Sequence, residues 1–195
     1  MNNNRKWIAL FSHTGKEIYN ISKKSGKWPD SIITNKTPGS KDICPSITNE
    51  FSSETGNEVI YCSTKPSVAQ YRQLLDTDAI VTLHGWMQII PGVICEEYEI
   101  YNLHPGLITQ YPELKGKDPQ KKVAEDPNEG KYKNVGCVIH KASAEIDSGE
   151  VIMERSTYNV YPSENKLTEH LHEMAQSLWV DFFDLYESGR LDEIL

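Results

Sequence analysis

Short apolar runs alternate with amphipathic segments along the first half of the chain, and this alternation restricts the possible folds more than any other feature. Lys6–Phe11 is an almost continuous apolar run, which is typical of a strand buried on both faces. A Ser-His-Thr-Gly turn follows, and apolar residues then recur at helical spacing until Gly26. The same reading predicts further strands at Ser31–Thr34, Val59–Cys62 and Ala79–Leu83, and a helix over Pro66–Leu75.

Strands that alternate with helices across short connections predict an α/β fold with a Rossmann-like, mainly parallel sheet and helices on both faces. Residues 35–57 are polar and contain Pro and Gly, so we expect a loop there with at most one short helix. Two later extended segments, Val135–Ala142 and Glu150–Val160, indicate an antiparallel, hairpin-like C-terminal addition. A long final helix with one apolar stripe is expected from Ser163 to Gly189.

Composition and charge exclude several classes of protein. A chain of 195 residues, 38% hydrophobic, is long enough for one domain with a substantial core, and we expect residues 1–195 to form a single domain. The formal charge of −8 argues against a nucleic-acid partner, because such proteins usually carry a basic face. Six lysines between residues 115 and 133 are the local exception. They form either a solvated loop or an anion-attracting rim.

The four cysteines lie far apart without a C-x-x-C pair, so we predict neither a metal site nor a redox dithiol. The apolar part of the N-terminal segment is too short for a signal peptide. No apolar run approaches the roughly 18 residues of a membrane span. We therefore expect a cytoplasmic protein with no membrane partner, present as a monomer or homodimer.

Asn102 and His104 are the first candidates for chemistry. On an extended backbone, residues i and i+2 point to the same face, so both side chains leave one side of a strand end. Pro105 and Gly106 then turn the chain away and leave room for a ligand beside the imidazole. Taken alone, the same residues could equally satisfy local backbone groups.

Asp147 lies in a Ser-Gly turn between the two later extended segments, a position where acidic residues are common for structural reasons. Together with Asn102 and His104 it supplies what acyl transfer to an amine needs. The oxygen of the tetrahedral intermediate requires hydrogen-bond donors, which Asn102 and His104 can provide. A nearby carboxylate favours the protonated imidazole and can order a water or relay a proton.

These motifs resemble those of the folate-dependent formyltransferases, and within that family the enzymes that act on glycinamide ribonucleotide. The matching segments are NLHPGL with a following YP, V-x-x-H, and I-D-S-G-x-V-I. ITNK, LHGWMQIIP and the final SGRL agree as well, so the resemblance covers most of residues 7–191. It implies a single formyltransferase-like domain that uses 10-formyltetrahydrofolate as co-substrate and needs no metal.

Carried over by position, the resemblance implies that Asn102, His104 and Asp147 are the catalytic residues. It also implies a small phosphate-binding turn at Thr14, Gly15 and Lys16, where N–H groups at a helix N-terminus and a lysine favour an anion. The residues implied to line the pterin slot are Met87, Gln88, Ile89 and Ile90 in one segment, and Ala142, Ser143, Ala144, Glu145 and Ile146 in another.

Several departures from the family pattern concern the formyl acceptor. His13 and Lys16 replace small residues in the first turn, and Ala175 stands where the glycinamide ribonucleotide enzymes carry a glutamate, with His172 one turn earlier. The loop from Pro112 to Pro119 is longer and more charged than usual. The expected partner is therefore a small phosphorylated amine, either similar to glycinamide ribonucleotide or, alternatively, a nucleotide-linked amino sugar or other modified nucleotide.

Two further alternatives remain open from the sequence. A formyltetrahydrofolate hydrolase would use water in place of the amine and release formate. A non-catalytic folate- or nucleotide-binding module would keep the fold without the chemistry. A methionyl-tRNA formyltransferase is disfavoured, because the chain shows no C-terminal RNA-binding domain and is acidic.

Overall fold

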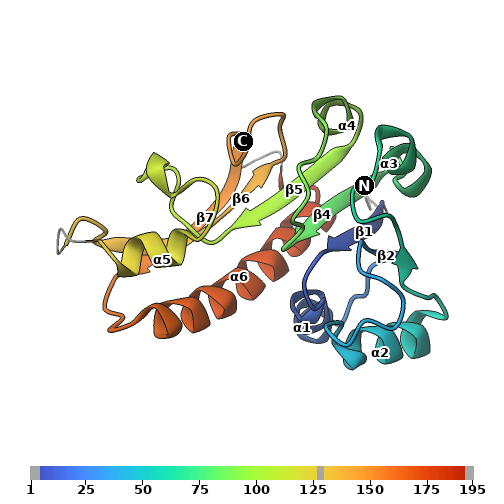
Figure 1. Ribbon diagram of the computed structural model, residues 1–195, viewed down its shortest axis with the longest axis horizontal. Coiled ribbons are helices and arrows are strands. Elements are labelled where there is room, and N and C mark those ends of the chain that lie inside the picture. The colour runs from blue at the N-terminus through green and yellow to red at the C-terminus, as the bar shows by residue number, and fades with distance from the viewer. Residues whose placement is uncertain (1–4, 127–129, 192–195) are drawn as a thin grey trace. The chain divides into compact units, whose positions relative to one another are not determined.

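The computed structural model describes residues 5–126 and 130–191 (Figure 1). The chain divides into two compact units, of which the first ends at Asn102 and the second begins at Leu103. The elements in chain order are β1 (Lys6–Phe11), α1 (Lys16–Ser25), β2 (Ser31–Thr34), α2 (Pro45–Thr55), β3 (Ile60–Tyr61), α3 (Val68–Leu74), β4 (Ala79–His84), α4 (Gly92–Glu97), β5 (Glu99–His104), η1 (Pro112–Leu114), α5 (Pro119–Ala124), β6 (Asn134–Lys141), β7 (Val151–Tyr158) and α6 (Glu164–Glu187).

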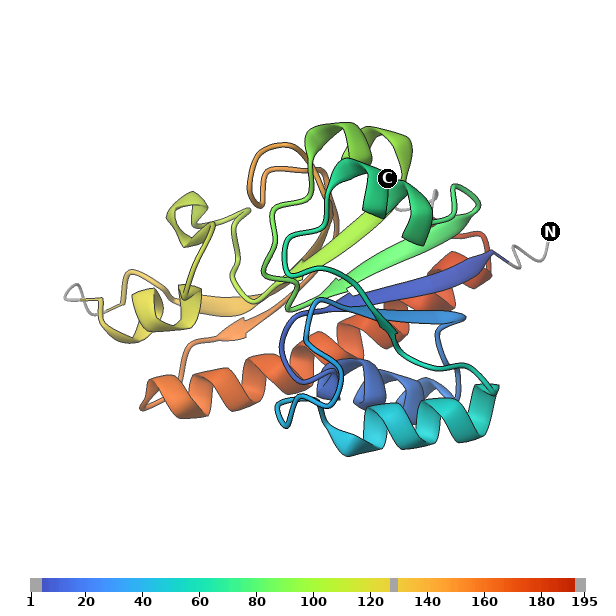
Figure 2. The ribbon, with the colours of Figure 1, turned by 45° about the vertical axis from the view of Figure 1, so that its right-hand side comes forward.

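The first unit is a parallel sheet covered by helices. β1 pairs with β2 and with β4, β3 lies beyond β2, and β5 lies beyond β4, all in parallel. Figure 2 shows α1 and α2 on one side of these strands and α3 and α4 on the other. All six residues of β4 and the last five of β1 are buried, as expected for central strands covered on both faces. The turns after β1 and β4 consequently lie at the same edge of this sheet.

The second unit contains the hairpin and the long helix. β6 and β7 pair in antiparallel fashion, with an irregularity between Ile139 and His140, and α6 packs against both strands. A separate small core under the segment that follows β5 contains Leu107, Ile108, Leu114, Tyr132 and Val138. This core fixes the path of the chain between β5 and β6.

Most predicted elements are present, with three corrections. The strand expected at Val59–Cys62 is reduced to Ile60–Tyr61. Residues 35–57, expected to be mostly loop, contain the eleven-residue helix α2. The charged stretch after Pro112, expected to be a loop, contains η1 and α5. Within the described residues, no helix combines the length and apolar character that a membrane crossing requires.

Candidate active site

His104 is the last residue of β5, two positions after Asn102, and both residues belong to this strand. The imidazole is 4% exposed and both its nitrogens have partners. Nε2 lies 2.9 Å from the carbonyl oxygen of Leu114, and Nδ1 lies 3.2 Å from Oδ2 of Asp147. The predicted pair of His104 and Asp147 is therefore brought together within the second unit.

Asp147 lies in the turn between β6 and β7 in a left-handed conformation with φ 48°, which Asp tolerates better than most residues. Its Oδ2 accepts a hydrogen bond from the Gly116 N–H at 2.8 Å, and its Oδ1 lies 3.4 Å from Nε2 of His140. The turn depends on Gly149, because a Cβ there would lie 1.8 Å from the carbonyl oxygen of Lys141. The D-S-G sequence thus serves both the turn and the placement of the carboxylate.

The charge on Asp147 is strongly favoured by these neighbours. Burial by itself would raise the pKa of the carboxyl group. The hydrogen bonds with the imidazoles of His104 and His140, the charge of His104 and the Gly116 N–H outweigh burial and hold the pKa of Asp147 well below its ordinary value. A carboxylate with such a low pKa is a poor proton acceptor. Its electrostatic role toward the imidazoles is therefore favoured over the proton relay considered from the sequence.

The hydrogen-bond partners of the two histidines define where protons are needed. The Leu114 carbonyl and the ionised Asp147 carboxylate are both acceptors, so the arrangement suits a His104 ring with a proton on each nitrogen. His140 has the same pattern, with Nδ1 2.9 Å from the carbonyl oxygen of Lys141 and Nε2 facing Asp147. One buried carboxylate thus supports two imidazoles, and His104 is arranged as a donor toward carbonyl oxygen.

His140 and Gly116 were not assigned roles from the sequence. His140 is 2% exposed and comes from the end of β6, directly before the turn that carries Asp147. That position, a histidine at a strand end near an acidic turn, is a signal that could have identified it. The Gly116 contact has no comparable signal, because it depends on the path of an irregular segment.

The lysines between residues 115 and 133 mostly bind their own unit. Lys122 Nζ donates to the carbonyl oxygens of Glu113 and Lys115, each at 2.9 Å. Lys115 Nζ donates to the Ser148 hydroxyl at 2.9 Å, and Lys131 pairs with Glu113 at 2.8 Å. The two carbonyls bound by Lys122 flank Leu114, the residue that contacts His104. The charged stretch therefore holds the backbone groups that reach His104 and Asp147.

Replacing Lys122 by alanine is expected to loosen this backbone. Loss of the ammonium removes two hydrogen bonds beside Leu114, so the Gly116 N–H should exchange with solvent about five- to tenfold faster than in the wild type. Lys121→Ala is the matched control, since Lys121 is its neighbour in α5 and makes an ion pair with Glu125 instead. Amide hydrogen exchange followed by NMR measures the effect. Equal Gly116 exchange in both variants would contradict the bracing role.

The predicted phosphate turn lies in the first unit at the start of α1. Gly15 is the N-cap residue with φ 73°, Lys16 is the first residue of the helix, and the Lys16 N–H donates to the Thr14 hydroxyl at 3.2 Å. The N-cap of α1 makes no side-chain capping hydrogen bond. Backbone N–H groups at such a helix start favour an anion.

The residues predicted to contact the pterin differ in exposure. Met87 and Ile89 are 52% and 70% exposed and so lie outside the core, whereas Ile90 is buried. Gln88 is half-buried between them. In the second unit, Ala142 and Ser143 are half-buried, and Ala144, Glu145 and Ile146 are exposed. Exposed aliphatic side chains next to polar backbone suit a flat heteroaromatic ligand.

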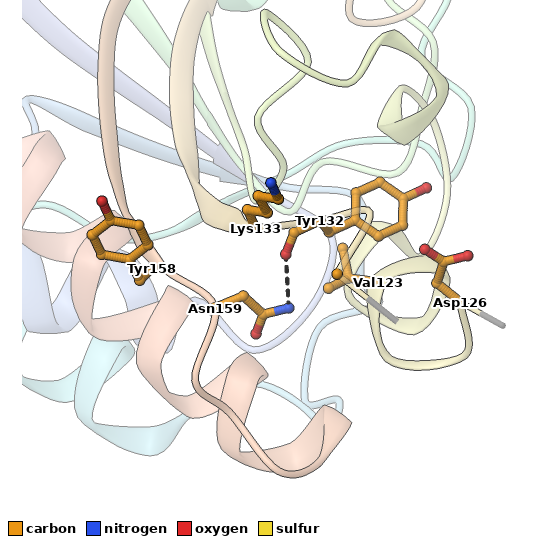
Figure 3. A pocket seen from close by; sticks show the side chains of 7 residues that line it. Val123, Asp126, Tyr132, Lys133, Tyr158 and Asn159 are labelled. Carbon is orange, nitrogen blue, oxygen red and sulfur yellow. Dashed lines mark hydrogen bonds between the residues drawn. The ribbon is translucent and has the colours of Figure 1, made fainter. Parts of the chain in front are cut away.

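A separate cavity of about 430 Å³ lies near the beginning of β6 and contains none of the predicted site residues. Its lining residues are Val123, Asp126, Gly130, Tyr132, Lys133, Tyr158 and Asn159. Figure 3 shows the Asn159 amide donating to the carbonyl oxygen of Tyr132, at 3.1 Å. His140 lies six residues along β6 from Asn134, about 20 Å at the usual rise of a strand. The cavity is therefore not the His104–Asp147 site.

Comparison with known proteins identifies the family. The model of the formyl transferase family matches residues 45–182 of this chain. The chain belongs to the formyl transferase family. A phosphoribosylglycinamide formyltransferase of Dictyostelium discoideum is 32% identical over 115 residues, which are 54% of this chain and 54% of that protein. The match thus spans about half the length of this curated relative.

Solved structures show that the fold extends over nearly the whole chain. A phosphoribosylglycinamide formyltransferase from Anaplasma phagocytophilum has a TM-score of 0.74 at 19% identity, covering 95% of this formyl transferase chain and 89% of the other. The Campylobacter jejuni protein of the same description gives 0.72 at 20% identity, covering 93% and 97%. These likenesses confirm the predicted α/β formyltransferase fold.

Proposed function

We propose that this formyl transferase family member moves a formyl group from 10-formyltetrahydrofolate to the primary amine of a small phosphorylated acceptor similar to glycinamide ribonucleotide. One observation carries the proposal. The buried imidazole of His104 at the end of β5 contacts a carboxylate through Nδ1 and a carbonyl oxygen through Nε2. Nε2 is therefore in position to donate a hydrogen bond to a carbonyl oxygen. The family match and the relatives named above supply the reaction class.

The chemistry follows from charge development in acyl transfer. The amine lone pair attacks the formyl carbon, and the carbonyl oxygen becomes negative. The bond from that carbon to the folate nitrogen then breaks, the folate nitrogen gains a proton and the new amide nitrogen loses one. A formyl oxygen that replaces the Leu114 carbonyl at His104 Nε2 would receive the same N–H, with the Asn102 amide as a second donor. Asp147, in contact with Nδ1, would orient the imidazole.

The substrate contacts are also part of this proposal. Thr14, Gly15 and Lys16 would bind the phosphate of the acceptor, and both Met87–Ile90 and Ala142–Ile146 would contact the folate. The enzyme would act in the cytoplasm without metal, nucleic acid or membrane, as a monomer or homodimer. Ala175 in α6 has a methyl side chain and therefore offers no carboxylate to the acceptor amine. This favours, as the second candidate acceptor, a nucleotide-linked amino sugar or other modified nucleotide.

A transfer assay tests the proposal. Protein, 10-formyltetrahydrofolate and each candidate amine are mixed, and donor consumption and acceptor mass are followed. A mass increase on glycinamide ribonucleotide supports the first acceptor, and one on a nucleotide-linked amino sugar alone supports the second. Formate released at a rate that amines do not change would select a hydrolase. Folate binding without any turnover would select a non-catalytic module.

Replacing Ile89 by serine is expected to weaken folate binding selectively. Because the side chain is 70% exposed, stability should change by less than about 0.5 kcal/mol. Loss of an aliphatic contact with the ligand should raise the KM for folate about tenfold. Val160→Ser is the control, since Val160 is 77% exposed and lies just beyond the far end of β7 from Asp147. An unchanged KM for folate in Ile89→Ser would remove Ile89 from the proposed site.

A further inference from the structure

Two side-chain contacts link the turn after β1 to the segment after β4 in the first unit. The side chain of His84, the last residue of β4, is completely buried, and its Nδ1 lies 2.9 Å from Oε2 of Glu17 in the first turn of α1. A second contact joins residues near these two: the Ser12 hydroxyl, just after β1, accepts a hydrogen bond at 2.9 Å from the N–H of Met87, just after β4. The two segments are therefore held together on both sides of the Thr14–Lys16 turn.

A close approach between the same segments adds a third link. Gly85 follows His84 with φ 61°, and a Cβ at Gly85 would lie 2.7 Å from Cδ2 of His13. Only glycine fits this conformation and this spacing without displacing the His13 ring. The contact between His13 and Gly85 therefore requires one relative position of the two segments.

The core fixes the opposite side of the His84 ring. Nε2 lies 2.8 Å from the hydroxyl oxygen of Thr82, and the Trp7 indole N–H donates to that same hydroxyl at 2.7 Å. Thr82 and Trp7 come from the central strands β4 and β1 and are buried. The ring thus has one nitrogen toward the central strands and one toward the start of α1, and only the second, through Glu17, reaches the exposed turn. Buried polar chains of this kind give a site one defined arrangement.

We propose that His84 is a positioning residue that couples the acceptor phosphate turn to the folate segment. With Glu17 bound to His84, the start of α1 and residues 85–90 adopt one arrangement. A ligand that orders either segment then also orders the other. Binding of a phosphorylated acceptor and of folate should therefore strengthen each other by the same factor. The inference rests on the proposed function for the assignment of these two segments to substrates.

Two near-isosteric variants separate the two arms of the ring. His84→Asn places its amide nitrogen near the position of Nδ1, so it retains a donor for Glu17 and loses the Thr82 contact. His84→Gln places its terminal amide near the position of Nε2, so it retains the Thr82 contact and loses Glu17. Glu17→Gln weakens the same arm from the other side. Thr82→Val removes the core anchor and leaves the Glu17 contact, so it serves as a control for general destabilisation.

The coupling is measured by calorimetric titration with inorganic phosphate, without and with saturating tetrahydrofolate. In the wild type, tetrahydrofolate should tighten phosphate binding about five- to tenfold. His84→Gln and Glu17→Gln should lose this factor, while His84→Asn and Thr82→Val keep it. In formyl transfer, His84→Gln and Glu17→Gln should raise the KM values of both substrates by about the same factor and change kcat by less than about twofold.

Each other outcome overturns either this proposal or the proposed function. Full coupling in His84→Gln would show that the Glu17 arm does not act. Equal loss in His84→Asn and His84→Gln, or loss in Thr82→Val, would reduce the effect to general destabilisation, which thermal unfolding of each variant would also register. If the wild-type protein transfers formyl groups but shows no coupling between phosphate and tetrahydrofolate, this inference is wrong and the proposed function stands. If coupling depends on His84 but no formyl group is transferred, the proposed function is wrong and the coupling role of His84 stands.

Discussion

Replacing His104 by alanine is expected to lower kcat for formyl transfer by about 10²- to 10³-fold, because the formyl oxygen loses a donor that matters most when it carries negative charge. The KM values of both substrates should change much less, since the interaction is strongest in the transition state. Steady-state kinetics with 10-formyltetrahydrofolate and the preferred amine measure the effect.

The control for this variant is Tyr158→Ala, which removes an exposed aromatic ring at the end of β7 in the same unit and should leave kcat unchanged. Loss of the His104 ring also removes a partner of the Leu114 carbonyl and of Asp147. Folding of the variant is therefore checked by circular dichroism and thermal unfolding. A folded His104→Ala protein that retains wild-type kcat would show that the imidazole takes no part in the chemistry.

His104 and Asp147 could each be identified from local features of the sequence, and the family resemblance implied that they belong to one site. A strand that ends in N-x-H-P-G sends both side chains to one face, and a D-S-G turn between two extended segments places the carboxylate at a hairpin end. The remaining contacts depend on tertiary structure. Gly116 donates to Asp147 because the irregular segment after β5 folds over Leu107 and Ile108, and no periodicity in the sequence encodes that path.

The helices that sequence reasoning underestimated have weak apolar patterns. α2 buries only Ile47 and Phe51 among its eleven residues, and it begins with Pro45 after an N-cap that makes no side-chain capping bond. α5 buries Pro119 and presents charged residues elsewhere. Both helices are explained by packing, α2 against α1 and α5 against α6. A short polar helix that depends on a neighbour leaves little trace in its own residues.

The low pKa of Asp147 is another property that the sequence alone could not supply. The sequence indicates that an acid and a histidine belong to one site but gives no distances between them. The pKa depends on the competition between burial and contacts at 2.8 to 3.4 Å. His140 contributes one of these contacts, because the turn between β6 and β7 places Asp147 beside the end of β6. The direction of this pKa shift favours an electrostatic role for Asp147 over a proton-accepting one.

Asp147→Asn is expected to reduce formyl transfer by at least about 10²-fold, because an amide cannot stabilise a charged imidazole as a carboxylate does. The two histidines would face a group that is neutral, and one of them would face its N–H donors. Asp184→Asn makes the same chemical change at an exposed position of α6 and should keep wild-type turnover. Comparable kcat values for the two variants would argue against any role of the carboxylate in catalysis.

The same variant should change how stability depends on pH. The folded-state pKa of Asp147 is depressed, so its carboxylate stabilises the fold fully above the unfolded value of about 3.9, and this contribution is lost as the pH falls below it. Asparagine carries no charge at any pH. The difference in the free energy of unfolding between wild type and Asp147→Asn should therefore be largest near neutrality and shrink steadily as the pH falls from about 5 to about 2. Urea unfolding at several pH values measures it. A difference that stays constant over this range would show that the two imidazoles and the Gly116 N–H do not hold Asp147 in its charged form.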